Sequence, residues 1–203
     1  MDERIPSNTR RWPVQKRSQD RLERVLRIAE GLIVERGFAN LNVRELADIA
    51  NVNISTIYAC FPNSKAILRF LAVRYIEEIE DKLESWLGEI ARSDSAEMMV
   101  DQLIDKFIQF YEDYPSWKAI WRGVQSDSEL LAMDMEDTRA TAAHFGALLK
   151  LINPALSDNV ELTAMVLITI NGAVIRLASE LSVREREAAH RQLRQLARRM
   201  LIF

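Results

Sequence analysis

The sequence has few of the residues that interrupt helices. Its 203 residues include six glycines and five prolines, and the segments between the prolines are long. Glycine and proline are the main breakers of regular structure, so these segments leave room for helices. We find no convincing alternation of apolar and polar residues and no internal repeat. The sequence therefore predicts an all-α protein.

Cysteine and histidine are scarce as well. The single cysteine, Cys60, cannot form an internal disulfide, and a reducing, cytoplasmic compartment is expected. The two histidines, His144 and His190, stand far apart, and we find no phosphate loop, dinucleotide fingerprint or metal-ligand spacing. We therefore expect no enzymatic activity, no catalytic residue, no cofactor and no metal site.

Long apolar runs are also missing. No window approaches the ~18 uninterrupted apolar residues of a membrane-spanning helix. The N-terminus "MDERIPSNTRRWPVQKR" lacks the apolar stretch of a signal peptide. We expect no membrane partner, and the chain is long enough for one large domain or two small ones with a buried core.

Charge is unevenly distributed along the chain. Residues 1–75 hold 13 Lys/Arg and 8 Asp/Glu, a net charge of +5, whereas residues 76–203 hold 14 and 22, a net charge of −8. Together they give the chain its net charge of −3. A basic front suggests a polyanionic partner.

The first helices can be placed from apolar spacing and capping residues. Residues 1–17 form a basic, proline-containing arm without apolar periodicity. Apolar residues then recur at spacings of three and four from Ser18 until Gly37, which is a helix stop. Asn42, followed three residues later by a glutamate, predicts the start of a short second helix that ends near Ala50.

Capping residues and prolines place the remaining helices, for a total of about nine. The predicted starts are Asn53, Asn63/Ser64, Ser95, Ser116, Ser126, Asp158 and Ser182. The expected organisation is the arm over residues 1–17, a three-helix domain over 18–64 and a larger helical bundle over 65–203.

The stretch "NVNISTIYACF", residues 51–61, follows the second helix directly. Two short helices joined by a tight turn and preceded by a longer one form the outline of a helix-turn-helix. Asn51 stands where the turn needs a left-handed residue, which asparagine tolerates better than most.

A helical wheel divides the third helix into two faces. The inward face is expected to pack on Leu46, Ile49 and the first helix, and it consists of Ile54, Ile57 and Phe61. The outward face is small and polar, with Ser55, Thr56 and Ala59 at its centre and Tyr58 and Cys60 on its flanks. Such a face can approach the floor of a groove closely.

The run "VLRIAEGLIVERGFANLNVRELADIANVNISTIYACFPNSKAIL" resembles the DNA-binding domain of TetR-family transcriptional regulators. Many spaced positions agree over about 45 consecutive residues. The resemblance implies a homodimeric repressor of a double-stranded DNA operator that a small-molecule effector releases. Its third helices would enter successive major grooves, with half-sites ~34–36 Å apart. Its last two helices, about residues 160–201, would form the dimer interface.

Seven positions carry the DNA contacts that the resemblance implies. They are Asn42 and Arg44 at the start of helix two, Asn53, Ser55, Thr56 and Tyr58 in helix three, and Lys65 at the start of helix four.

Four positions depart from the pattern of the family. Asn51 replaces a usual glycine, Ile54 and Ser64 stand at frequent lysine positions, and Cys60 stands at a frequent histidine position. Each lost phosphate contact flattens the log–log salt dependence of binding by nearly one unit. Compensation is expected from Arg44 or from the arm residues Arg10, Arg11, Lys16 and Arg17. The alternative is a helical binding module whose DNA binding is weakened or lost.

The C-terminal part supplies the candidate effector site and the dimer interface. The ligand-binding candidates are Phe107, Tyr111, Trp117, Trp121, Phe145 and Asn171. The two pairs on either side of Pro115 are expected to converge. The apolar run "MVLITINGAVIRLA", with Gly172 and Ala173, is expected to pair with a second copy. The last helix would add Leu193, Leu196, Met200 and Ile202, and the two copies would form a four-helix bundle.

Overall fold

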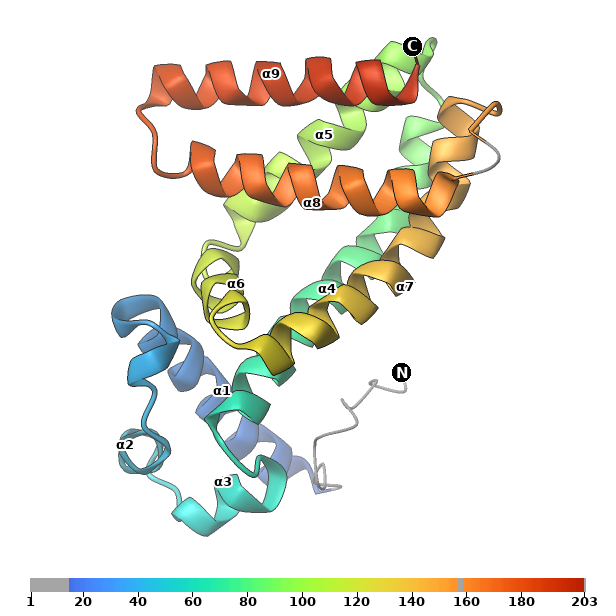
Figure 1. Cartoon of the computed structure of the whole chain (residues 1–203). Coiled ribbons are helices and arrows are strands. Elements are labelled where there is room, and N and C mark those ends of the chain that lie inside the picture. The colour runs from blue at the N-terminus through green and yellow to red at the C-terminus, as the bar shows by residue number, and fades with distance from the viewer. Residues whose placement is uncertain (1–14, 157–158, 203) are drawn as a thin grey trace. The chain divides into compact units, whose positions relative to one another are not determined.

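The computed structural model describes residues 15–156 and 159–202 (Figure 1). Within these ranges the chain forms nine α-helices, one short 3-10 helix and no strand, which confirms the all-α prediction. The elements are α1 (Lys16–Arg36), η1 (Phe38–Asn40), α2 (Val43–Ala50), α3 (Ile54–Cys60), α4 (Ser64–Ile90), α5 (Ala96–Asp113), α6 (Trp117–Gln125), α7 (Ser128–Ile152), α8 (Val160–Ala178) and α9 (Val183–Leu201).

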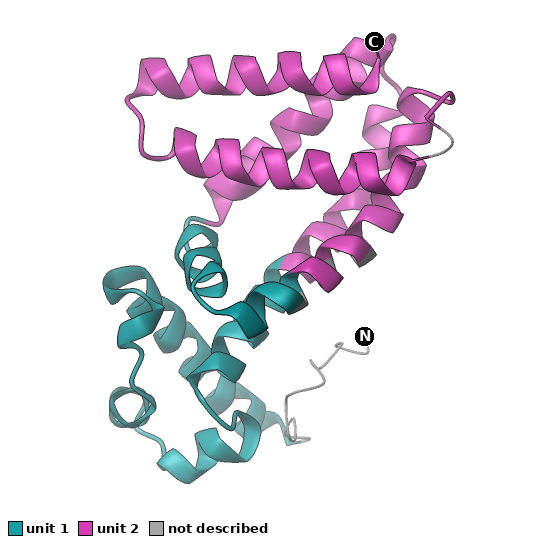
Figure 2. Ribbon diagram, viewed as in Figure 1, with its two compact units in different colours: residues 1–75, 115–134 teal, residues 76–114, 135–203 magenta. Residues whose placement is uncertain are grey.

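The helices belong to two compact units (Figure 2). Unit 1 holds the chain up to Tyr75 together with residues 115–134, and unit 2 holds residues 76–114 and 135–203. The chain therefore passes between the units inside α4, just before α6 and inside α7. Helix α6 packs with α1 and η1, so unit 1 contains more than the N-terminal helices.

Most predicted helix starts match the structure. Asn42, Asn53 and Ser95 each accept backbone N–H bonds at the N-termini of α2, α3 and α5. The Ser182 N–H and hydroxyl both donate to the Glu185 carboxylate, at 3.1 and 2.5 Å, at the start of α9. These caps satisfy backbone groups that a helix end otherwise leaves without partners.

Two helix starts differ from the predicted positions, and a third lies outside the described residues. Helix α1 begins at Lys16, two residues before the predicted Ser18, so Lys16 and Arg17 are helical. The cap of α7 was wrongly predicted at Ser126, because Asp127 accepts the N–H groups of Glu129 and Leu130 at 3.0 and 3.2 Å. The predicted cap at Asp158 lies outside the described residues.

The core of unit 1 forms around the apolar face of α1. Leu46 and Ile57 are fully buried, and Phe61 is 1% exposed. The predicted inward packing of Ile49 is wrong, since this side chain is 50% exposed. Helix α2 instead buries Val43, Leu46, Ala47 and Ala50, a face that leaves Ile49 toward solvent.

Gly123 of α6 permits close packing within unit 1. A Cβ atom at this position would lie 2.8 Å from the Phe38 Cβ and 2.9 Å from the Leu68 Cδ2. Any larger residue would push α6 away from η1 and α4, so glycine holds the three elements together at this spacing.

Helices α5, α8 and α9 pack against one another in unit 2. Two ion pairs join α9 to α5, one between Arg194 and Asp105 and the other between Arg198 and Asp101. Their arginines and aspartates repeat at intervals of four, so each pair lies one helical turn from the other. This packing buries Leu193 to 1% exposure, so its predicted role in a dimer interface is wrong.

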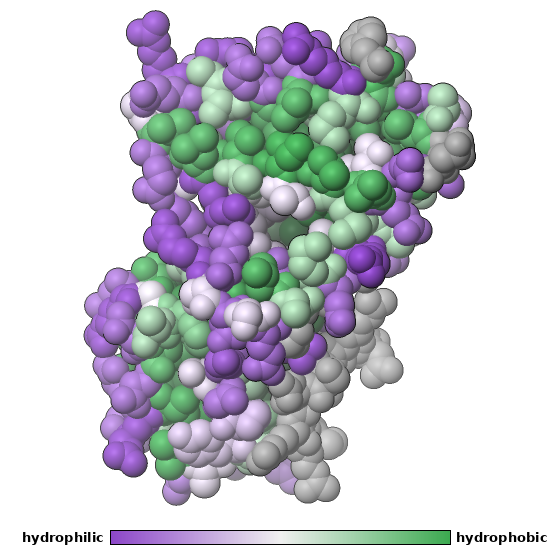
Figure 3. Space-filling model, viewed as in Figure 1, coloured by the Kyte–Doolittle hydropathy of each residue, from purple (hydrophilic) through white to green (hydrophobic). Residues whose placement is uncertain are grey.

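Helix α8 is unusually apolar on its outer side. Its described residues are long and apolar enough to cross a membrane by length and composition, although one such helix is weak evidence and core helices pass the same test. Figure 3 shows an apolar band along α8. Leu162, Val166 and Leu177 are 58%, 40% and 57% exposed. Gly172 is buried, so its predicted position at a contact between two copies is wrong.

Candidate nucleic-acid interface

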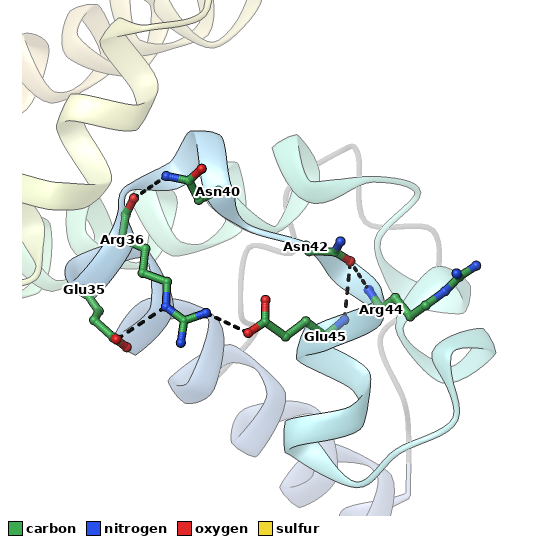
Figure 4. A network of polar contacts seen from close by, with 6 residues as sticks. All are labelled: Glu35, Arg36, Asn40, Asn42, Arg44 and Glu45. Carbon is green, nitrogen blue, oxygen red and sulfur yellow. Dashed lines mark hydrogen bonds and ion pairs between the residues drawn. The ribbon is translucent and has the colours of Figure 1, made fainter.

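Asn42 fixes the start of α2. Its Oδ1 accepts the N–H groups of Arg44 at 2.9 Å and of Glu45 at 3.4 Å (Figure 4). The cap engages the carbonyl oxygen and leaves the amide nitrogen as a donor. Asn42 is exposed, so this donor lies where a phosphate oxygen can reach it.

Glu45 does not complete a reciprocal capping box with Asn42. Its Oε1 instead accepts the Arg36 Nη1 at 2.7 Å, and Arg36 also bonds Glu35 (Figure 4). The hydrogen bonds to Glu45 and Glu35 raise the pKa of the Arg36 guanidinium. The network ties the end of α1 to α2 and occupies Arg36, while the exposed Arg44 side chain points away from it.

The turn between α2 and α3 depends on Asn51. Asn51 has φ 50° and ψ 53°, the left-handed conformation predicted for it, and no other described non-glycine residue has a positive φ. Its N–H and that of Val52 donate to the Asp48 and Ala47 carbonyls at 3.1 and 3.0 Å. The turn thus closes α2 with backbone bonds in the manner of a left-handed C-cap.

Asn53 fixes the start of α3 in the same way that Asn42 fixes α2. Its Oδ1 accepts the Ser55 N–H at 2.9 Å and the Ser55 hydroxyl at 2.7 Å. The Ser55 hydroxyl therefore has its donor engaged and offers its lone pairs. This position of α3 suits a donor on the partner, such as a base amino group or a water.

Apart from Cys60, the outward face of α3 has the composition that the wheel predicts. Ser55 and Ala59 are exposed, Thr56 is half-buried and Tyr58 is 44% exposed. Ile54 is half-buried and Ile57 fully buried. Without a charged side chain, α3 cannot form the bidentate arginine–guanine contact, and it presents hydroxyl, methyl and phenol groups instead.

Cys60 does not belong to this face. It is 4% exposed, and burial raises the pKa of its thiol. The predicted position on the flank of the outward face is therefore wrong. Cys60 packs with the core side of α3, which makes it an inert small residue.

Lys65, at the start of α4, is already engaged within unit 1. Its Nζ lies 2.5 Å from Asp127 Oδ2 and 3.7 Å from Glu129 Oε2. The hydrogen bond to Lys65 lowers the pKa of the Asp127 carboxyl, and the N–H groups of α7 lower it further. A phosphate that takes Lys65 has to compete with Asp127.

A polar cluster that the sequence reading missed joins three helices of unit 1. The Tyr75 hydroxyl donates to Glu30 at 2.6 Å, and Ser116 bonds both Tyr75 and Glu30. Burial, followed by the bond to Glu30, raises the pKa of Tyr75 well above its ordinary value. The cluster fixes α1, α4 and the start of α6 to one another. Tyr75 lies where the chain leaves unit 1, and Ser116 lies where it returns.

Three of the ligand-binding candidates gather in unit 2. The Phe107 ring stacks on Phe145 and Tyr111, with centroid distances of 5.3 and 6.4 Å, and meets Trp86 edge-on at 5.3 Å. Phe107 and Phe145 are 5% and 1% exposed. They form an apolar aromatic cluster in the interior of the unit.

Trp117 and Trp121 belong to unit 1. Their rings stack at 5.5 Å, and Trp117 is 5% exposed. The two aromatic pairs on either side of Pro115 therefore fall in different units, and their predicted convergence stays a prediction.

Asn171 is the most unusual buried polar group of unit 2. It is 2% exposed on the inner face of α8, and its Oδ1 has no hydrogen-bond partner within the described chain. A buried acceptor without a partner costs about 1–3 kcal/mol. Asn171 is therefore a candidate for contact with a bound molecule.

Two family models together match more than half of the chain. Residues 25–70 match the family model described as bacterial regulatory proteins, tetR family, and residues 96–201 match the model of the tetracyclin repressor-like C-terminal domain. A search of curated proteins found no match.

Solved structures share the fold at low sequence identity. GusR from Salmonella enterica is 16% identical, with a TM-score of 0.69 over 93% of this chain and 98% of its own. A putative TetR-family regulator from Mesorhizobium loti is 15% identical, with a TM-score of 0.70 over 92% and 98%. The fatty acid degradation regulator FadR from Bacillus halodurans is 16% identical, with a TM-score of 0.67 over 87% and 94%.

In the part of the chain that the structure describes, no group of three or more His, Cys, Asp or Glu side chains could hold a metal ion.

Replacing Asp127 by asparagine tests the Lys65 ion pair. The folded pKa of Asp127 lies below the ordinary value of about 3.9, so the carboxylate stabilises the fold above that pH. This stability is lost as the pH falls through the folded pKa. We expect Asp127→Asn to lower the free energy of unfolding at pH 7, and the difference from the wild type to disappear in acid, as measured by urea denaturation. Glu129→Gln is the control, since its longer pair should matter little; a pH-independent effect of Asp127→Asn would contradict the ion pair.

Proposed function

This chain belongs to the tetR family of bacterial regulatory proteins, and we propose that it is a homodimeric repressor that a small-molecule effector releases from its operator. DNA-binding transcriptional regulation is the activity of the family, and ligand-responsive repression is typical of it. The observation that best supports operator contact by this chain is the small, polar and exposed face of α3, held by the capped turn at Asn51 and Asn53.

In the proposed complex, different residues contact the bases and the phosphates. Ser55, Thr56 and Tyr58 read the groove through hydroxyl, methyl and aromatic contacts. Arg44 and the amide donors of Asn42 and Asn53 hold phosphates, which fix the register of the protein on the duplex. Because α3 lacks charged side chains, sequence preference depends on thymine methyl groups, bridging waters and DNA shape.

Lys65 can contact DNA only if it breaks its ion pair with Asp127. It can neutralise a phosphate only after leaving Asp127, so its net contribution to DNA affinity is smaller than that of an unpaired lysine. The other cations must therefore supply most of the electrostatic free energy.

The proposed effector site lies in unit 2. Phe107, Tyr111 and Phe145 provide an apolar aromatic surface, and Asn171 provides a buried acceptor without a partner. These groups suit an apolar or aromatic molecule that carries at least one N–H or O–H donor. The other two candidate residues, Trp117 and Trp121, belong to unit 1 and are not included in this proposed site. The effector must favour the conformer that fits DNA poorly, and DNA must weaken effector binding by the same factor.

The proposed dimer uses the exposed apolar face of α8 with part of α9. Leu162, Val166 and Leu177 of α8 repeat at spacings that place them on one side. Val183 and Leu196 of α9 are 70% and 41% exposed. Exposed apolar patches of this kind are typical of protein–protein interfaces. A two-fold axis would bring the same face of two copies together.

Tyr58→Ala tests the DNA-binding face. We expect operator affinity to fall at least tenfold, with unchanged thermal stability, because the exposed phenol contacts DNA and not the core. The operator is the duplex enriched from a random library on the full-length protein, and gel shift measures the affinity. Val34→Ala, at a 53% exposed position of α1, is the control. Equal affinity of Tyr58→Ala and the control would contradict the assigned face, and failure of the wild type to enrich any duplex would support a binding module that has lost DNA recognition.

Asn171→Leu tests the effector site. We expect this near-isosteric change to stabilise the empty protein by about 1–3 kcal/mol, since it removes a buried acceptor without a partner. The same change should abolish the release of DNA by effectors found in a screen with the wild type. Thr141→Val is the control, because the Thr141 hydroxyl has a partner in Glu80 at 3.5 Å. A clear loss of stability in Asn171→Leu would instead assign the amide a structural role.

Charge placed in the apolar face of α8 tests the dimer. We expect Leu162→Glu combined with Leu177→Glu to give monomers at micromolar concentration in sedimentation velocity, because two carboxylates would be buried at the interface. Leu151→Glu, at a 45% exposed position of α7, should remain dimeric. A monomeric wild type would refute the proposed interface.

A further inference from the structure

The outer face of α1 carries a line of arginines. Arg17, Arg21 and Arg24 follow one another at spacings of four and three, so they lie on one side of the helix, and all three are exposed. We refer to these three residues as the arginine stripe. It continues past the end of the basic arm and belongs to a regular, well-packed helix.

The arginine stripe is not used by the fold. Arg36 and Arg74 of the same unit pair with Glu45 and Glu23 at 2.7 and 2.8 Å. Within the described residues the structure gives the three stripe arginines no ion pair and no hydrogen bond.

Few acidic residues accompany the stripe along α1. The segment 16–27 contains five basic and two acidic residues. Of the two acids, Glu23 is occupied by Arg74, which leaves Asp20 as the only other carboxylate on this stretch of α1. The stripe is therefore locally cationic although the whole chain is acidic.

Gly31 extends the same face by two further turns. It lies seven residues after Arg24 and is exposed, and a Cβ atom there would meet nothing within 4 Å. Glycine inside a helix costs about 1 kcal/mol relative to alanine, and no close neighbour among the described residues requires it here. Its effect is to leave the backbone of α1 open at the end of the stripe.

The stripe begins at the end of unit 1 that presents the recognition helix. Figure 1 draws the first turn of α1 and helix α3 at the same end of the unit. Arg17 to Arg24 span about 10 Å along the helix axis, which is long enough for the three guanidinium groups to reach neighbouring phosphates of one DNA strand. Arginine is suited to phosphate because its planar guanidinium donates two parallel hydrogen bonds.

We propose that the arginine stripe binds the phosphate backbone of the duplex that flanks the operator half-site. The inference rests on the proposed DNA-binding function and adds a second contact surface to it. The stripe contributes charge without reading bases, so it raises affinity for every sequence equally. The stripe supplies the positive charge that α3 lacks. It also compensates for Lys65, whose charge is paired with Asp127.

The test compares Arg21→Gln/Arg24→Gln with Arg92→Gln/Arg139→Gln in the full-length protein. Both double variants remove two exposed cations, so the net charge changes equally, and the second pair lies in unit 2. Each protein is titrated against the selected operator with long flanks and against its trimmed core, over a range of salt concentrations. Thermal denaturation checks that both variants fold.

We expect the stripe variant to flatten the log–log salt slope on the long duplex by up to about 3.6, from four lost contacts in a dimer. On the trimmed core it should match the wild type, and the control should match the wild type on both. Equal slopes for the two variants on the long duplex would overturn the proposal.

Elution from immobilised heparin, a sulfated polyanion, separates the stripe from the operator function. If no operator is found, the proposed function fails, and the stripe still predicts earlier elution for Arg21→Gln/Arg24→Gln than for the control. Co-elution of the two variants overturns the stripe as a polyanion surface. Weaker binding to anionic lipid vesicles with an unchanged DNA slope would also overturn it, because the partner would then be a membrane.

Discussion

Binding to DNA draws much of its free energy from cations that neutralise phosphates, and α3 carries none. A recognition helix with only hydroxyl, methyl and phenol groups can fit a groove closely, but it cannot hold the protein there. The cations have to come from the elements around it, and the structure shows which of them are available. Arg36, Arg74 and Lys65 are paired with carboxylates, whereas Arg44 and the arginine stripe have no such partner among the described residues.

The position of α3 depends on local bonds that the sequence specifies. Asn42 and Asn53 cap two short helices, and Asn51 makes the left-handed turn between them. These features could be predicted because caps and turns depend on the side chain at one position and the backbone two or three residues away. The cap of α7 was predicted at Ser126 because serine and aspartate are both common N-cap residues. Asp127 caps the helix instead, and its carboxylate also binds Lys65 from a distant part of the sequence.

The parts that could not be predicted depend on residues far apart in the chain. The sequence near Lys65 gives no sign that its partner is Asp127. Glu30 and Tyr75 come from α1 and α4, and Ser116 directly precedes α6. Leu193 looks like any apolar residue of an amphipathic helix until α5 and α8 pack against α9 and bury it. Ile49 was misplaced for a related reason, because an eight-residue helix leaves the orientation of its buried face to the neighbours. The seven proposed DNA contacts and the effector site therefore remain proposals, although the fold and the family are established.

In the proposed complex, operator affinity comes mainly from cations outside α3. The most direct test is the slope of log K against log salt for the wild-type protein on its flanked operator. Arg44 with the arginine stripe provides four cations in each protomer, and a dimer should give a slope near −7. A slope of about −2 or flatter would contradict the claim, because it would leave these arginines without phosphates.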